Sequence, residues 1–213
     1  AVVRCRKGDI WKGVKEHVQT LNEKEKETLR TWFKRQGPSG KEGGWVDCNT
    51  GRKDSKTGKI KYNYKDFKLS KVINEVVYNA NMLLKEGQRI HYPEDIDDIT
   101  LYQDERILEL ILSNVIQNAI KYSGKNSEIG IHVNQDKSNT VFKIKDQGIG
   151  IPHKDLNNVF AQHFRAENAL NTPGTGIGLN IVKTHLENLG GSATVKSIEN
   201  KGTTMTLCLP NKQ

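Results

Sequence analysis

The order in which apolar periodicities follow one another after residue 66 limits the fold of this chain more than any other feature. Apolar residues recur every three or four positions over residues 72–84, 105–122 and 177–189, which predicts three amphipathic helices. The remaining regular segments alternate or are short and extended, and they predict strands over residues 89–92, 99–103, 128–134, 140–146, 193–197 and 203–209. The last four strands form two hairpins. This order favours an α/β fold, an α+β two-layer sandwich in which helices cover one face of a mixed, mostly antiparallel sheet.

Capping residues and turn formers set the expected ends of these elements. Asp104 is a good N-cap for the second helix, because a carboxylate accepts hydrogen bonds from the free N–H groups of a first turn. Gly87 is expected to end the first helix and Gly190 the third, since glycine readily adopts the left-handed conformation that ends many helices. Residues 136–139 are expected to form the turn of the first hairpin.

Positive charge is concentrated in the first third of the chain. Residues 1–66 contain 17 of the 33 Lys and Arg residues and 9 of the 25 Asp and Glu residues, so residues 67–213 hold 16 of each sign. All three tryptophans also lie before residue 66. The change in composition predicts a boundary there, between a basic, helical and Gly-rich N-terminal segment of residues 1–66 and a folded domain of residues 67–213.

The N-terminal segment combines an amphipathic pattern over residues 8–36 with a polar, glycine-rich stretch that follows it. We expect one or two helices and then a loop. A basic segment with tryptophans could bind nucleic acid. A solvated linker beside a small helical unit is the favoured interpretation, because the segment carries no DNA-binding or RNA-binding motif.

Composition excludes several classes of protein and of site. No apolar run approaches the roughly 20 residues of a membrane-spanning helix. The charged first residues do not resemble a signal peptide, so we expect a soluble, cytoplasmic protein. The three cysteines, Cys5, Cys48 and Cys208, are too scattered for a disulfide framework or a zinc site, and the six histidines lack metal-ligand spacing.

The helix expected over residues 105–122 carries an unusual polar stripe. Asn114, Asn118 and Lys121 follow one another at spacings of four and three, so they share one side of the helix. Asparagine is a mediocre helix former, and two on one stripe call for a reason. A magnesium triphosphate would supply one, since an amide oxygen can bind Mg²⁺ and an ammonium can neutralise phosphate. A plain solvent-facing stripe is the alternative for this helix taken alone.

A carboxylate at the end of the strand over residues 140–146 is the second candidate site residue. Asp146 has the same parity as the apolar residues Phe142 and Ile144, so it is expected to point inward. A buried carboxylate needs hydrogen-bond donors, such as an exocyclic amino group. Gly148 and Gly150 follow directly, and glycine lets a chain turn sharply and lets a flat ligand approach the backbone.

A glycine-rich start of the third helix and a long preceding loop complete the set. The residues GTGIGL expose backbone N–H groups at a helix start, where an anion is attracted. Their spacing is neither the dinucleotide fingerprint nor a P-loop. The stretch from 152 to 173 is polar and long enough for a lid, with Phe160 and Phe164 to dock and Arg165 to reach a phosphate.

The four motifs in this order resemble one known family. ILSNVIQNAIKYS, DQGIGIP, NNVFAQHFR and GTGIGL are similar to the N, G1, F and G2 boxes of the catalytic ATP-binding domain of sensor histidine kinases, in the GHKL superfamily. The resemblance covers about residues 67–210. It implies a sandwich of a mixed sheet and a helical layer, with ATP held between the N-box helix and the lid.

The resemblance also implies roles for individual residues. Asn118 would bind Mg²⁺, Asn114 and Lys121 would help to hold the phosphates, and Tyr122 would pack beside the purine or ribose. Asp146 would accept a hydrogen bond from the adenine amino group. The other residues expected at the nucleotide, with Arg165 as a further catalytic residue, are Gly148, Gly150, Phe160, Gly174, Thr175, Gly176, Gly178 and Leu179.

Asn114 bears on the type of reaction that the resemblance implies. Hydrolysing GHKL proteins have a glutamate four residues before the magnesium-binding asparagine, and this chain has Asn114 there, which cannot act as a general base. We therefore expect transfer of the γ-phosphoryl group of ATP to a histidine rather than fast hydrolysis. The implied partners are a phosphoacceptor histidine domain and the receiver domain of a response regulator.

The chain departs from the family pattern in three places. It has no phosphoacceptor box, because His17 is followed by Val18 instead of an acidic residue, so we expect the acceptor to lie outside this chain. The dimerising hairpin is not visible, which leaves a homodimer open, and His163 replaces the second aromatic residue of the F box. The alternatives are a GHKL-type ATPase and a nucleotide-responsive binding module whose basic N-terminal segment binds nucleic acid or a partner. The chain could also be the soluble part of a membrane-associated kinase.

Overall fold

The computed structural model describes residues 52–53, 60–93 and 95–211, which belong to one compact unit, Asn49–Gln213. The helices expected within residues 8–36, His17 and the glycine-rich stretch up to residue 51 lie outside the described residues. The boundary predicted near residue 66 stays a prediction.

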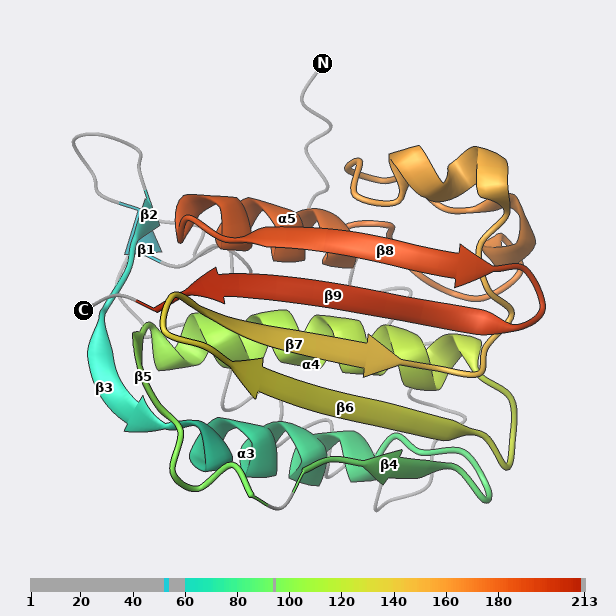
Figure 1. Ribbon diagram of the computed structural model, residues 1–213. Coiled ribbons are helices and arrows are strands. Elements are labelled where there is room, and N and C mark those ends of the chain that lie inside the picture. The colour runs from blue at the N-terminus through green and yellow to red at the C-terminus, as the bar shows by residue number, and fades with distance from the viewer. Residues whose placement is uncertain (1–51, 54–59, 94, 212–213) are drawn as a thin grey trace, which may run out of the picture. The chain divides into compact units, whose positions relative to one another are not determined.

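A five-stranded sheet forms one layer of this unit (Figure 1). Its strand order is β4-β6-β7-β9-β8, with β4 parallel to β6 and all other neighbours antiparallel. The bounds of the strands are Arg89–His91 (β4), Glu128–Gln135 (β6), Asn139–Lys145 (β7), Ser192–Ile198 (β8) and Gly202–Pro210 (β9). Both predicted hairpins, β6 with β7 and β8 with β9, are confirmed, because each strand alternates apolar and polar residues as a sheet with one buried face requires.

Three helices lie side by side against one face of this sheet (Figure 1). They are α3 (Leu69–Asn81), α4 (Glu105–Tyr122) and α5 (Gly178–Asn188). Their apolar stripes pack on the inward residues of the strands, including Ile131, Phe142 and Leu207, all of which are almost fully buried. The predicted two-layer α/β sandwich is therefore confirmed. Among the described helices, none is both long and apolar enough to cross a membrane.

Two small antiparallel pairs lie outside the main sheet. The strand β3 (Lys65–Lys68) pairs with β5 (Thr100–Gln103), and β1 (Arg52–Lys53) pairs with β2 (Ile60–Lys61). The predicted strand over residues 99–103 therefore exists as β5, but it does not join the main sheet. Residues just before β3 are tied to the helices: Tyr62 Oη lies 3.0 Å from His185 Nδ1 of α5, and the backbone N–H of Asn63 donates to Asp104 Oδ2 at 2.7 Å.

The helix ends test the predicted capping residues. Asp104 caps α4 as predicted, and its Oδ1 accepts from the N–H groups of Arg106 and Ile107 at 3.1 and 3.2 Å. The prediction for α3 was wrong: the helix ends at Asn81, well before Gly87. Continuing the helix beyond Ala80 would bury little more apolar surface, because Met82 and Leu83 are more than half exposed and only Leu84 of residues 81–84 packs, partly buried, against the core. Gly87 lies in a later turn with φ of 71°.

Candidate functional site

A cavity of about 310 Å³ lies between α4, the inner face of the sheet, the start of α5 and the segment 152–173. All of the predicted site residues line it except Gly148 and Phe160. Those that do are Asn114, Asn118, Lys121, Tyr122, Asp146, Gly150, Arg165, Gly174, Thr175, Gly176, Gly178 and Leu179. The structure therefore brings together residues that are up to 65 positions apart in the sequence (179 − 114).

The polar stripe of α4 faces this cavity. Asn114, Asn118, Lys121 and Tyr122 are half-buried and span about 12 Å along the helix axis, at about 1.5 Å per residue. The side-chain amide of Asn114 donates to the carbonyl of Leu110 at 2.8 Å, which leaves its Oδ1 on the cavity side. The Lys121 Nζ lies 4.7 Å from the ring centre of Tyr122. Both asparagines are thus held among protein groups rather than in open solvent.

The last turn of α4 is held by two side chains that the sequence patterns did not indicate. Lys85 Nζ donates to the carbonyls of Lys121 and Ser123 at 2.8 and 2.5 Å. The buried Gln88 side chain donates to the carbonyls of Ile120 and Gly124 at 3.2 and 2.9 Å. These bonds satisfy carbonyls that a helix end leaves free, and they fix the turn that presents Lys121 to the cavity.

Asp146 is a buried carboxylate at the inner wall of the cavity. It is 9% exposed, and its Oδ1 accepts from the backbone N–H groups of Gly148 and Thr203 at 2.8 and 3.1 Å. Burial raises the pKa of Asp146 above the ordinary aspartate value, and these two backbone hydrogen bonds oppose part of that rise. Since both bonds end on Oδ1, Oδ2 is the oxygen available to a donor in the cavity.

The glycines after Asp146 are required mainly by the protein itself. A Cβ on Gly148 would lie 2.7 Å from the carbonyl oxygen of Tyr122, and Gly148 forms a bridge with Ser123. Gly150 adopts a φ of 63°, and a Cβ there would clash with the carbonyl oxygen of Ile198. Both glycines let the turn pack between α4 and the β8–β9 turn, and of the two Gly150 lines the cavity. That they admit a flat ligand stays a prediction.

The glycines of GTGIGL make room for the polar stripe of α4. A Cβ on Gly174 would clash with Lys121 Nζ, and a Cβ on Gly178 would lie 2.9 Å from Asn114 Oδ1. Helix α5 begins at Gly178, and no side chain of the described residues caps its first turn. Its free N–H groups and the positive end of its dipole are therefore directed to the same region as Lys121, which favours an anion.

The predicted lid is more ordered than a plain loop. It contains two short 3₁₀ helices, η1 (His153–Asn158) and η2 (Glu167–Ala169). Arg165, expected to reach a phosphate, lines the cavity but uses Nη2 to donate to the carbonyls of Ala169 and Leu170 at 2.5 and 2.9 Å, and also to that of Thr172. It therefore holds the lid backbone together in this structure.

Aromatic docking also differs from the expectation. Phe164 lines the cavity, whereas Phe160 packs against the core with Lys183 Nζ 5.7 Å from its ring centre. The neighbouring His163 adopts a φ of 61°, a conformation uncommon for residues other than glycine, and this places Phe164 at the cavity wall. The sequence could not show which of the two phenylalanines faces the cavity, because the lid has neither the alternating pattern of a strand nor the three-to-four-residue pattern of an α-helix.

Several cavity residues escaped the sequence analysis. Gln117 lies on α4, and Thr203 is the second residue of β9. Asn168 of the lid donates through Nδ2 to the carbonyl of Gly150 at 3.0 Å. Gln117 could have been found as a neighbour of the asparagine stripe. Nothing in the local sequence marks Thr203 or Asn168, because their positions depend on the β7–β9 register and on the path of the lid.

The arrangement suits a ligand with an apolar flat part and an anionic tail. Ile144 and Met205 supply an apolar wall beside Asp146, and Lys121 with the start of α5 supplies positive potential. No cluster of three or more His, Cys, Asp or Glu residues occurs within residues 60–93 and 95–211. A metal ion at this cavity would therefore need amide oxygens and the ligand's own oxygens, as Mg²⁺ commonly does.

Comparison with known proteins gives similarity to one family throughout this region. The family model described as histidine kinase-, DNA gyrase B-, and HSP90-like ATPase matches residues 103–213. The sensor histidine kinase WalK of Bacillus subtilis strain 168 is 32% identical over 164 residues, which cover 72% of this chain and 27% of WalK. The histidine protein kinase SaeS of Staphylococcus epidermidis is 33% identical over 175 residues, which cover 79% of this chain and 47% of SaeS. The chain thus spans less than half of either relative.

Solved structures give the same similarity at the level of the fold. The mycobacterial sensor histidine kinase MprB superposes with a TM-score of 0.60 and 26% identity, covering 70% of this chain and 99% of that one. The catalytic domain of the histidine kinase ThkA gives a TM-score of 0.60 at 23% identity, and the match covers 71% of this chain and 99% of the ThkA domain. At such identity the second match shows a shared fold alone.

Proposed function

Because this chain belongs to the histidine kinase-, DNA gyrase B- and HSP90-like ATPase family, we propose that it binds ATP in the cavity beside α4 and transfers the γ-phosphoryl group to a histidine of another domain. The family resemblance seen in the sequence is confirmed. We further propose that the acceptor domain and a response-regulator receiver domain are its partners and that the reaction takes place in the cytoplasm.

One observation carries this proposal. A single cavity joins a buried carboxylate, Asp146, to the asparagine and lysine stripe of α4 and to the uncapped start of α5. The Oδ2 of Asp146 would accept from the exocyclic amino group of adenine, and the apolar wall would cover the base. Lys121 and the N–H groups of α5 would then hold the triphosphate by charge and by hydrogen bonds.

The donor set also fits a magnesium ion. Asn118 faces the cavity beside the start of α5, and an amide oxygen with phosphate oxygens and water is a suitable ligand set for Mg²⁺. When bound, the ion would neutralise charge on the transferred phosphoryl group. The protein would orient the phosphates through Lys121 and the start of α5. Such positioning supplies most of the rate enhancement in a reaction of this type.

The residue at position 114 supports transfer rather than hydrolysis. An amide cannot take a proton from water, and the Nδ2 of Asn114 is already engaged with the carbonyl of Leu110. The lid would exclude water while Arg165 and Asn168 hold its backbone in place. A bound ATP would therefore persist until an acceptor imidazole arrives.

Binding and transfer are tested separately. The whole chain is titrated calorimetrically with ADP and with ATP, each with and without Mg²⁺. Both nucleotides should bind, and ATP should bind more tightly with Mg²⁺ than without it. Absence of binding to either nucleotide would remove the proposal. Incubation with γ-labelled ATP should label this chain little by itself, and His17→Ala should not change that. Acid-labile label should appear when a kinase dimerisation domain with an intact acceptor histidine is added, and rapid release of labelled phosphate by the chain alone would point to an ATPase instead.

A further inference from the structure

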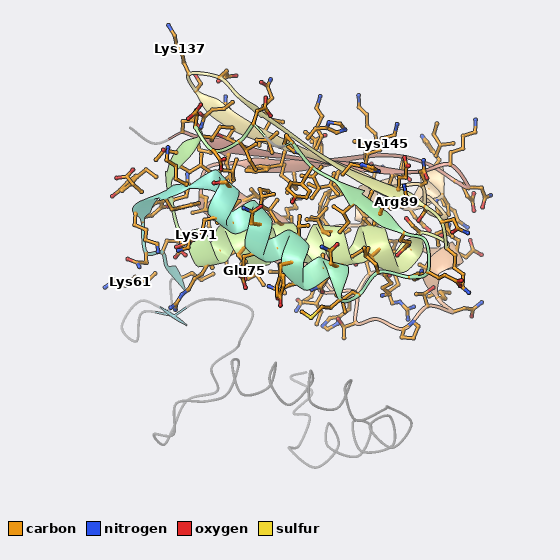
Figure 2. The ribbon with its side chains drawn as sticks, turned by 90° about the horizontal axis from the view of Figure 1, so that it is seen from below. Lys61, Lys71, Glu75, Arg89, Lys137 and Lys145 are labelled. Carbon is orange, nitrogen blue, oxygen red and sulfur yellow. The ribbon has the colours of Figure 1, made fainter. Side chains whose placement is uncertain are left out.

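The face of the main sheet opposite to the helices is open along the described residues. Figure 2 shows Lys145 and Arg89 on this side, away from Lys71 and Glu75 of α3. Outward positions alternate with buried ones on every strand, as a sheet with one covered face requires. We call this surface the open sheet face; its charged or ionisable members are Arg89, His91, Glu128, His132, Lys143, Lys145 and Lys196.

One row of residues crosses all five strands in register on the open sheet face. The pairings place His91 beside Gly130, Gly130 beside Lys145, Lys145 beside Thr204, and Thr204 beside Lys196. Basic side chains thus alternate with small ones over about 19 Å, at about 4.8 Å per strand. The next row brings His132 beside Lys143. The face therefore presents long basic side chains that small neighbours leave free to extend.

Apart from His91, the basic residues of this face lack ion-pair partners among the described residues. Elsewhere lysines meet carboxylates: Lys71 with Glu105 at 2.8 Å, and Lys125 with Glu86 at 2.9 Å. On the open sheet face the single carboxylate, Glu128, lies 3.7 Å from His91, and within residues 60–93 and 95–211 no carboxylate pairs with Arg89, Lys143, Lys145 or Lys196. Residues 67–213 hold 16 charges of each sign, yet the described strands of this face present Arg89, Lys143, Lys145 and Lys196 against the single carboxylate of Glu128, so the face carries a net positive charge.

Ordinary solubility does not account for this pattern. Lysines often protect the edge strands of a sheet from pairing with other chains. Lys143 and Lys145, however, lie on β7, which is the central strand and has a neighbour on both sides. Lysine is also disfavoured in strands relative to threonine or valine, so two lysines there call for a further reason.

We propose that the open sheet face is a peripheral docking surface for membranes that contain anionic lipid headgroups. The face has no Trp, Tyr or Phe among the outward residues of its described strands, so it lacks the aromatic anchors that usually carry protein interfaces and the stacking platform that single-stranded nucleic acids require. Flexible ammonium groups extending from one broad sheet complement a plane of negative charge, and such binding needs no apolar anchor.

This inference does not depend on the proposed function. The nucleotide cavity is lined by inward residues such as Ile144 and Met205, so it lies on the opposite side of the sheet from Lys145 and Lys196. The domain could therefore lie on a membrane with the cavity open.

The test uses the whole chain and vesicles made of equal parts phosphatidylglycerol and phosphatidylcholine, with pure phosphatidylcholine vesicles as the reference. The variant replaces Lys143, Lys145 and Lys196 by Gln. Each lysine near such a surface strengthens binding about fivefold, so the triple variant should partition roughly a hundredfold less into the anionic vesicles. Co-sedimentation at increasing lipid concentration measures this ratio, and circular dichroism with thermal denaturation shows whether the variant is folded.

A matched control removes the same charge elsewhere. Lys71, Lys125 and Lys154 each pair with a carboxylate away from the open sheet face, and replacing all three by Gln should change partitioning less than threefold. Equal losses in the two triple variants, or no loss in the sheet variant, would overturn the proposal. Tighter, face-dependent binding to duplex DNA or to polyglutamate than to anionic vesicles would replace the membrane by nucleic acid or by an acidic protein.

Discussion

Replacing Asp146 by Asn tests how the cavity would recognise a base. In the Asp146→Asn variant the side-chain oxygen could still accept from the N–H groups of Gly148 and Thr203, which fix the native carboxylate at 2.8 and 3.1 Å. The new amide nitrogen would then occupy the place of Oδ2 and face the amino group of adenine with a second donor. The substitution therefore changes an acceptor into a donor with little change in shape.

The expected loss follows from the bonds involved. A hydrogen bond to a charged group is worth about 1.5–3 kcal/mol, and an unpaired buried donor costs about 1–3 kcal/mol. Allowing for partial solvation of the mutant amide, ADP should bind with about 2–4 kcal/mol less free energy, or roughly 30-fold to 900-fold more weakly. IDP, whose base has an oxygen acceptor at the corresponding position, should bind the variant relatively better than ADP. Isothermal titration with both nucleotides measures the exchange of preference.

The raised pKa of Asp146 adds a dependence on pH with a definite sign. Because burial lifts the folded-state pKa above the unfolded value, the charged form is destabilising above the folded pKa, and this cost disappears as the pH falls through it. The Asn variant should therefore equal or exceed the native protein in thermal stability at neutral pH, with the difference shrinking on acidification. ADP affinity of the native protein should fall over the same range. An Asn variant that bound ADP within threefold of the native protein and kept its preference over IDP would refute this account of recognition.

Three further substitutions test the other parts of the site. Asn114→Glu would place a general base near a water beside the phosphates and should raise the rate of ATP hydrolysis at least about tenfold. Asn114→Gln should not raise it. Equal hydrolysis rates of the two variants would contradict the role given to this position. Gln88→Leu would remove the side-chain donor to the carbonyl of Ile120, whereas that of Gly124 would keep the Ser127 hydroxyl, so it should lower the free energy of unfolding by about 1–3 kcal/mol and weaken ADP binding. Asn79→Ala, which breaks only an exposed bond to Glu75, should do neither in thermal denaturation and titration. Phe164→Ala should weaken ADP binding more than Phe160→Ala, because only Phe164 lines the cavity, and the reverse order in titration would contradict the observed lid.

The parts of the fold that sequence patterns predicted are those whose cause is local. Asp104 caps α4 through its own side chain, and the residues of β7 alternate because one face is covered. The end of α3 and the position of β5 could not be predicted in this way. The first depends on how much apolar surface the rest of the domain offers beyond Ala80, and the second on pairing with β3 instead of the main sheet.

In the candidate site, too, the residues that were predicted depend on a single element, and those that were missed depend on contacts between distant segments. Asp146 was identified by parity and Asn118 by helical spacing, which are properties of single elements. Lys85 and Gln88 were missed, although they hold the last turn of α4, because their contacts join residues more than 30 positions apart. Phe160 was predicted to contact the nucleotide, although it is Phe164 that lines the cavity, because no periodicity in the lid distinguished the two phenylalanines.

The glycines of the site explain why the motifs could be recognised before the fold was known. A Cβ on Gly174 would meet Lys121 Nζ, and a Cβ on Gly178 would meet Asn114 Oδ1 at 2.9 Å, so the glycine loop and the polar stripe of α4 are two sides of one contact. Side chains on the loop would push α4 and α5 apart and separate the stripe from the free N–H groups of α5. The spacing of asparagine, lysine and glycine is therefore imposed first by the packing of two helices, and the proposed anion-binding region follows from that packing.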